Sequence, residues 1–164
     1  MIGVGQNALS ISILRPYGGW IQDFKPRIER ALKAYFEVTG QDSVSRVGIR
    51  YINKIVVPGA QAKPELYFTN IRQSDEKLEA ELVHFVQRLE YTKADGIKIL
   101  LAHATLVPTN PDTTEFLLDI DAVWDTAPVE SKDILDLADR LHSAEKKAFY
   151  ALITAEARKI FDAA

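Results

Sequence analysis

The segment Arg46–Val57 (RVGIRYINKIVV) constrains the fold more than any other part of this chain. It is long, contains no proline and is rich in β-branched side chains, which favour extended structure. Side chains of a strand point alternately to opposite faces. One face is therefore mainly apolar (Val47, Ile49, Tyr51, Asn53, Ile55 and Val57), and the other is largely charged (Arg46, Gly48, Arg50, Ile52 and Lys54). The pattern predicts a strand over Ser43–Pro58 with a core face and a polar face.

Two further segments with regular patterns precede this strand. Ala8–Leu14 alternates apolar and small polar residues, which is typical of a half-buried strand. Apolar residues then recur at three- and four-residue spacing (Ile21, Phe24, Ile28, Leu32, Tyr35 and Phe36). This stripe predicts a helix from about Asp23 to the residue before Gly40.

The segments after the strand predict a three-stranded meander. Ile97–Val107 and Glu115–Trp124 have strand patterns, and Asp95-Gly96 is a favourable hairpin tip. Leu78–Tyr91 fits either a helix or a strand, and the neighbouring hairpin favours a strand over about Leu82–Thr92.

The C-terminal part of the chain returns to helical spacing. Apolar residues recur with a helical period from Val129 to about Ala151, and Thr154 is expected to cap a short helix over Ala155–Phe161. The order of elements predicts one α+β domain over residues 1–164. We expect a mainly antiparallel sheet of about five strands with two long helices packed on one face, a two-layer sandwich.

Composition excludes several functional classes. The net charge of −3 argues against a general nucleic-acid binder and against attraction to an anionic membrane. The absence of cysteine excludes a disulfide framework, a thiolate zinc site and a cysteine nucleophile. Met1–Leu14 is too short and too polar for a signal peptide or a membrane span. We expect a cytoplasmic protein with no cofactor and with neither nucleic acid nor membrane as a partner.

Charged residues on two predicted strands form the main candidate site. Arg46, Arg50 and Lys54 share one strand face at intervals of about 13 Å, and such a face can bind a carboxylate or phosphate. Asp119 and Asp121 point the same way from the last strand, and paired carboxylates can bind a cation or perform acid–base chemistry. The alternative that we favour is cross-strand ion pairing between these aspartates and arginines.

Other candidate residues have weaker patterns. His142 and Glu145 lie three apart on the C-terminal helix, as in half of a helical metal site, but a second such pair is missing from the sequence. The sequence also lacks a nucleophile elbow and a phosphate-binding loop, so we predict no metal site and no catalytic residue. Trp20 and Phe24 continue an apolar stripe and are expected in the core. Arg15 and Tyr17 fall outside that stripe and remain candidate recognition residues.

Several phrases read together resemble a known family. They are Leu14–Tyr17, Arg46–Asn53 (RVGIRYIN), Leu118–Asp121, and Leu141-His142 with the segment Phe149–Phe161. Over essentially the whole chain they resemble a sporadically distributed family of uncharacterised bacterial and archaeal proteins, and RVGIRYIN is the most specific phrase. The resemblance implies no particular activity, substrate or catalytic residue.

Members of that family are usually longer, and this chain resembles the C-terminal two thirds of one. We therefore expect either a short member or a fragment that lacks N-terminal strands. A sheet that has lost strands exposes an edge, which invites pairing with a second copy.

Three functional hypotheses follow. The first is a non-enzymatic binding module that recognises a protein partner or a small anionic ligand through Arg46, Arg50, Asp119 and Asp121. The sporadic distribution of the resembled family suggests an accessory or defence-associated role. The second is an enzyme that uses acid–base or divalent-cation chemistry from Asp119, Asp121, His142 and Glu145. The third is a purely structural homodimer.

Overall fold

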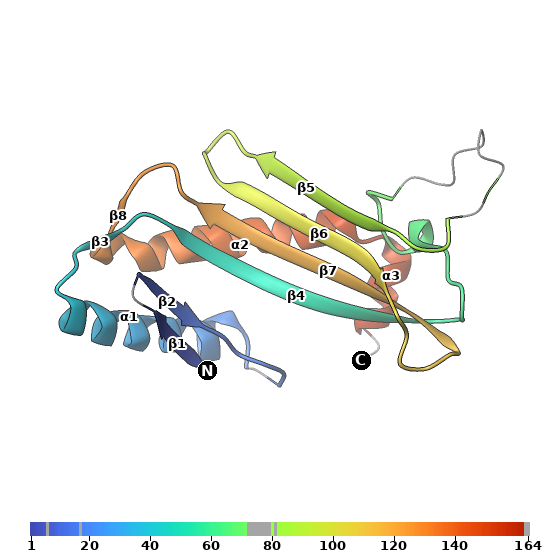
Figure 1. Ribbon diagram of the computed structural model, residues 1–164, viewed down its shortest axis with the longest axis horizontal. Helices are drawn as coiled ribbons and strands as arrows, with labels where there is room; N and C mark the ends of the chain where they lie inside the picture. Colours follow the sequence, from blue (N-terminus) through green and yellow to red (C-terminus); the bar gives the residue numbers. More distant parts are fainter. Residues whose placement is uncertain (6, 17, 72–79, 81, 163–164) are drawn as a thin grey trace. The chain divides into compact units, whose positions relative to one another are not determined.

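The computed structural model describes residues 1–5, 7–16, 18–71, 80 and 82–162 (Figure 1). The chain forms two compact units. The first unit contains Met1–Val47 and Asp125–Asp139, and the second contains Gly48–Trp124 and Arg140–Ala164. Whether the two units together form the single domain expected from the sequence stays a prediction.

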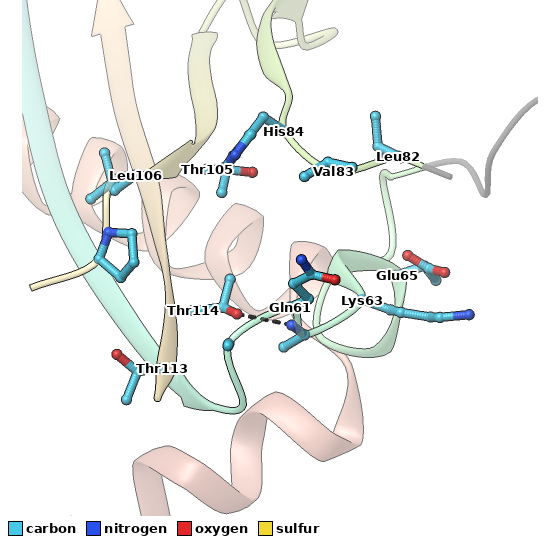
Figure 2. Close-up of a pocket in the computed structure, with 13 residues that line it drawn as sticks. Gln61, Lys63, Glu65, Leu82, Val83, His84, Thr105, Leu106, Thr113 and Thr114 are labelled. Atoms are coloured by element: carbon cyan, nitrogen blue, oxygen red, sulfur yellow. Dashed lines mark hydrogen bonds between the residues drawn. The ribbon is translucent and has the colours of Figure 1, made fainter. Parts of the chain in front are cut away.

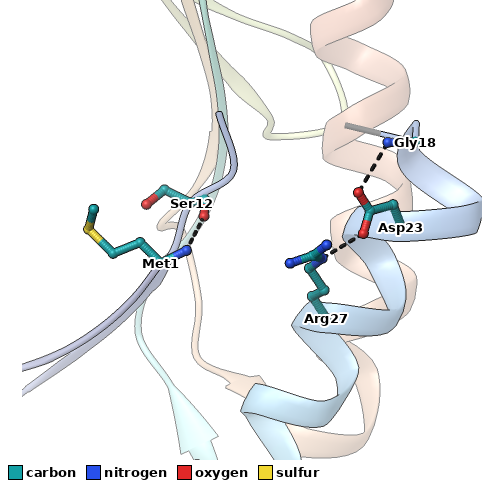
Figure 3. A network of polar contacts seen from close by, with 5 residues as sticks. All are labelled: Met1, Ser12, Gly18, Asp23 and Arg27. Carbon is teal, nitrogen blue, oxygen red and sulfur yellow. Dashed lines mark hydrogen bonds and ion pairs between the residues drawn. The ribbon is translucent and has the colours of Figure 1, made fainter. Parts of the chain in front are cut away.

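The first unit begins with an antiparallel hairpin of β1 (Ile2–Gly5) and β2 (Ala8–Ile11). Its open end is closed by Met1 and Ser12, because the Met1 ammonium donates to the Ser12 carbonyl at 2.7 Å and the Ser12 amide donates back at 2.9 Å (Figure 3). A second antiparallel pair joins β3 (Ser43–Val44) to β8 (Val129–Glu130).

A π-helical turn, Trp20–Phe24, leads directly into helix α1 (Lys25–Thr39). The Asp23 carboxylate accepts hydrogen bonds from the Gly18 amide at 3.1 Å and from Arg27 Nε at 2.5 Å, as Figure 3 shows. The Gly18 amide first and the Arg27 side chain second lower the pKa of Asp23.

The predicted first helix is confirmed at both of its ends. Pro26 lies in the first turn, where a missing amide proton costs nothing. The helix ends at Gly40, whose φ of 65° is left-handed and suits glycine, and the Gly40 amide donates to the Phe36 carbonyl at 3.0 Å.

The first unit also contains the beginning of helix α2 (Ile134–Leu152). Asp139 on this helix accepts hydrogen bonds from Trp20 Nε1 at 2.8 Å and from Lys25 Nζ at 2.5 Å. Trp20 is buried, as expected from the apolar stripe. One carboxylate thus ties the π-helical turn and the start of α1 to α2.

The second unit is built on a four-stranded sheet with the order β4-β7-β6-β5. The strands are β4 (Val47–Pro58), β5 (Val86–Thr92), β6 (Lys98–Leu106) and β7 (Thr113–Trp124). β5, β6 and β7 form the predicted antiparallel meander. The hairpin between β5 and β6 closes where the Gly96 amide donates to the Lys93 carbonyl at 3.0 Å, and Gly96 has a φ of 84°.

Helices cover one face of this sheet. The Tyr51 hydroxyl on β4 lies 3.3 Å from His142 Nδ1, so the second half of α2 lies on the face that carries Tyr51. Thr154 accepts a hydrogen bond from the Ala157 amide at 3.3 Å and caps α3 (Ala155–Asp162), as predicted. The core between helices and sheet contains the largest fully buried apolar side chains of the chain (Phe68, Phe116, Ile55, Ile97, Leu118, Ile120 and Leu141).

The predicted α+β class is confirmed, but the predicted five-stranded sheet with two helices on one face is wrong. The strand expected over Ala8–Leu14 pairs with β1 in a separate two-stranded sheet, and the strand expected over Ser43–Pro58 is divided into β3 and β4. Alternation in a sequence identifies a strand but not its partner. A partner only a few residues away has the smaller loop-closure cost, and the Gly-rich segment Ile2–Gly5 provides one.

The ambiguous segment is resolved only in part. The strand that we favoured over Leu82–Thr92 is confirmed from Val86 to Thr92, whereas residues 82–85 are not part of a strand. Residues 78, 79 and 81 lie outside the described residues. Pro64–Leu66 forms a single 3-10 turn.

Candidate functional site

The candidate site lies on the sheet face that carries Arg50 and Asp119, hereafter the outer face; the inner face carries Tyr51. Arg50 Nε donates to Asp119 Oδ1 at 2.8 Å, and Arg50 Nη2 donates to Asp119 Oδ2 at 2.5 Å. This two-pronged ion pair raises the pKa of Arg50, chiefly through the hydrogen bonds to Asp119. The cross-strand pairing predicted for these two residues is therefore present.

The two members of this ion pair differ in exposure. The Asp119 side chain is 11% exposed, whereas the Arg50 side chain is 56% exposed. The carboxylate thus fixes the guanidinium group from below, and Nη1 of Arg50 takes no part in the two hydrogen bonds. Such a fixed, exposed guanidinium can bind a further acceptor with little loss of side-chain entropy.

A second ion pair stands farther along the outer face, and sequence analysis missed it. Lys54 Nζ lies 2.7 Å from Glu115 Oε2, and Glu115 Oε1 accepts from the Thr109 amide at 3.0 Å and from its hydroxyl at 2.5 Å. Lys54 first and then Thr109 lower the pKa of Glu115 to about 2. Glu115 shares a strand face with Asp119, and this alternation in the sequence could have identified Glu115 as a candidate partner of Lys54.

A shallow hollow of about 440 Å³ lies beside the Arg50–Asp119 pair. Its floor is set by strand register, because Ala102 on β6 pairs with Asp119 on one side and with Arg88 on the other. Ala102 has only a methyl group, so the surface sinks between the two larger neighbours. In the next row of the same face Leu100 pairs with Asp121 and with Glu90.

Arg88 and Glu90 complete the walls of this hollow, and neither was predicted. Both are exposed residues on the edge strand β5. Within the described part of the chain their side chains form no hydrogen bond or ion pair. The sequence pattern of this segment fitted either a helix or a strand, so it did not show that Arg88 and Glu90 share a sheet face with Asp119.

The structure distributes the predicted site residues unevenly. Arg50, Asp119 and Asp121 line the same hollow. Arg46 precedes β4 and belongs to the first unit, as does Arg15, an exposed residue between β2 and the π-helical turn. Tyr17 lies outside the described residues.

His142 and Glu145 lie on the opposite side of the sheet from the aspartates. Arg50 and Tyr51 are neighbours on β4 and point to opposite faces, and His142 contacts Tyr51 whereas Asp119 contacts Arg50. The four residues of the enzyme hypothesis are thus not brought together. Among the described residues no group of three histidine or acidic side chains is placed to hold a metal ion.

Two buried ionisable groups on the inner side have no hydrogen-bond or ion-pair partner in the described part of the chain. Glu145 is 4% exposed, and burial raises its pKa to about 7. His103 is fully buried, both of its ring nitrogens lack a hydrogen-bond partner among these residues, and burial lowers its pKa to about 4. The His103 ring contacts Phe68 and Phe85 edge-on, with centroids 4.2 and 4.8 Å away.

A second hollow, of about 340 Å³, lies at the end of the second unit shown in Figure 2. Thr114 at its base is already engaged, because its hydroxyl donates to the Gly59 carbonyl at 2.6 Å and accepts from the Ala62 amide at 2.8 Å. Lys63 and His84, the cationic and imidazole side chains of its lining, are exposed and lie outside the strands. This hollow therefore has no charged side chain fixed by an ion pair among the described residues, as Arg50 is fixed on the outer face.

Comparison with protein-family models, curated proteins and solved structures finds no match to this chain. The family resemblance of the RVGIRYIN phrase stays a prediction. None of the helices in the described residues is long and apolar enough to cross a membrane.

Proposed function

We propose that this chain is a binding module that recognises an anionic group of its ligand on the outer face, between Arg50 and Arg88. The observation that carries the proposal is the Arg50–Asp119 ion pair at the edge of an open hollow. Asp119 holds the Arg50 guanidinium through two hydrogen bonds while more than half of the Arg50 side chain stays exposed.

Arg88 supplies the second half of the proposed anion site. It pairs with Ala102, which in turn pairs with Asp119, so the two arginines flank the alanine floor. Adjacent strands are separated by about 4.8 Å, and Arg88 therefore stands about 10 Å from Asp119 across the sheet. Long arginine side chains reach across such a gap, and guanidinium groups match the geometry of carboxylates and phosphates.

The enzyme hypothesis has less support from this geometry. This hypothesis requires its acid–base groups to lie around one reacting atom. Asp119 is engaged with Arg50, and His142 lies on the other face of the sheet. The accessory or defence-associated role suggested by the family resemblance is part of the proposal and rests on analogy alone.

The test is an NMR titration of the ¹⁵N-labelled chain with sodium acetate and with inorganic phosphate at constant ionic strength. We expect shifts at Arg88 and Ala102, and we expect Arg88→Ala to weaken binding at least tenfold because a charge-assisted hydrogen bond is lost. Arg30→Ala is the matched control, since Arg30 is an exposed arginine on α1 that does not line the hollow. Shifts that are absent from the hollow, or that persist unchanged in Arg88→Ala, would contradict the proposal.

A further inference from the structure

The hollow on the outer face contains two rows of opposite character. The first row runs through Asp119, Ala102 and Arg88, with Arg50 on the Asp119 carboxylate. The second row runs through Asp121, Leu100 and Glu90, two residues farther along each strand. Two residues of a strand span about 7 Å, so a basic end and an acidic end lie about that distance apart.

The charges of the hollow do not suit a simple anion or a simple cation. Two guanidinium groups (Arg50 and Arg88) and three carboxylates (Asp119, Asp121 and Glu90) line it. Asp119 is paired with Arg50, so Arg88 at one end and Glu90 at the other are the charged groups without a partner among the described residues. Asp121 adds its negative charge at the acidic end and is attracted to Arg50. An anion alone is repelled by the acidic end, and a cation alone is repelled by Arg88.

We propose that the ligand is a small zwitterion, an aliphatic amino-carboxylate whose carboxylate lies by Arg88 and Arg50 and whose ammonium group lies by Glu90. The apolar chain between the two charges then covers Ala102 and Leu100, which form the floor of the two rows. The volume of about 440 Å³ is in the range of sites for small molecules. This inference rests on the proposed function and adds the second, cationic group of the ligand.

The test compares three probes of equal chain length on the intact ¹⁵N-labelled chain: 6-aminohexanoate, hexanoate and hexylamine. We expect 6-aminohexanoate to bind at least tenfold more tightly than either single-charge probe, with shifts at Arg88, Glu90, Leu100 and Ala102. Because the charge separation is set by the strand rise, glycine, whose two charges are adjacent, is expected to bind more weakly than 6-aminohexanoate.

Two variants on the exposed edge strand separate the two ends of the site. Glu90→Gln is expected to reduce the affinity for 6-aminohexanoate to that for hexanoate while leaving hexanoate binding unchanged or tighter. Arg88→Gln is expected to weaken both probes, and Arg30→Gln neither. Both edge-strand side chains are exposed and without a partner in the described residues, so their amide variants keep the fold.

The outcomes distinguish this inference from the proposed function. If hexanoate binds as tightly as 6-aminohexanoate and both depend on Arg88, the anion site stands and the zwitterion inference is wrong. If hexylamine binds best, or if 6-aminohexanoate binding survives Arg88→Gln, the anion site is also wrong. If none of the three probes shifts resonances of residues in the hollow, the zwitterion inference is overturned. The acetate and phosphate titrations then show whether the anion site is also wrong.

Discussion

The outer and inner faces of the four-stranded sheet both contain buried ionisable groups, but these groups have different neighbours. On the outer face, counted over the whole residue, Glu115 is 2% exposed and Asp119 is 8% exposed, and each is paired with a cation. On the inner side Glu145 is 4% exposed and His103 is 0% exposed, and neither has a partner among the described residues. The pKa of Glu115 is lowered whereas that of Glu145 is raised. Lys54 and Thr109 lower the pKa of Glu115, whereas burial with no hydrogen-bond or ion-pair partner in the described part of the chain raises the pKa of Glu145.

The largest effect on this comparison is expected from Phe68→Ala. Phe68 is 1% exposed and packs against both His103 and Phe116, so its truncation leaves a cavity and lowers the free energy of unfolding by about 4 kcal/mol. The opening also hydrates the His103 ring, so the pKa of His103 should rise toward its ordinary range. Denaturant unfolding and NMR titration of the histidine measure the two effects. Phe68→Leu, which fills most of the space, should lose less stability, and an unchanged pKa in both variants would contradict the explanation.

Glu145→Gln is expected to stabilise the protein at neutral and alkaline pH. The native pKa of about 7 lies above the ordinary value of 4.5, so the native state binds more protons between these pH values and its stability falls as pH rises through this window. Removing the carboxyl group should therefore give about 3 kcal/mol more stability at pH 8 than at pH 4, relative to the parent. Chemical denaturation at both pH values checks this. A difference independent of pH would show that Glu145 does not titrate in this way.

His103→Leu should have the opposite pH dependence. The native pKa of about 4 lies below the ordinary value of 6.5, so the unfolded state binds more protons and stability falls as pH drops from 6.5 to 4. The stability of the variant relative to the parent should rise by about 3 kcal/mol over this window as pH falls. In the parent the two opposite slopes offset each other between pH 4.5 and 6.5, so each single variant reveals the slope of the other group. A parallel pH profile for His103→Leu and the parent would refute this.

The smallest expected effect belongs to the outer face. Arg50 is more than half exposed, so solvent screens its ion pair, and Arg50→Ala should cost about 1 kcal/mol at low salt and less at high salt. The double variant Arg50→Ala/Asp119→Ala should be less destabilised than the sum of the single variants by a similar amount. Thermal unfolding at two salt concentrations provides the measurement. Additive losses would mean that the pair makes no net contribution to stability.

The sheet face to which each side chain of the site points could be predicted from the sequence. The alternation of Arg50 with Tyr51 and of Asp119 with Ile120 is enough to place both charges on one side, and opposite charges on one side pair. The position of His103 could be predicted in the same way. It follows Ile99 and Leu101 at two-residue spacing on a predicted strand, so it points to the core face with them. The period of a strand tells which side a residue occupies without any knowledge of its neighbours.

Register and partner choice could not be predicted in the same way. The row of Arg88, Ala102 and Asp119 depends on the length of the Lys93–Gly96 turn and on pairings across three strands. A shift by one residue would place Arg88 on the inner face. The β1–β2 hairpin was missed for another reason, since Gly3 and Gly5 weaken the strand pattern of β1 and its pairing is local.

Ala102 has a consequence that concerns shape and not charge. The hollow is deep at this point because Ala102, between Asp119 and Arg88, has only a methyl group. A larger, branched side chain at this position would fill the hollow. Ala102→Leu should close the hollow while leaving every ion pair of the outer face in place. Access to the proposed ligand site is therefore controlled by a position that carries no charge, so steric fit and electrostatic attraction can be altered independently of each other.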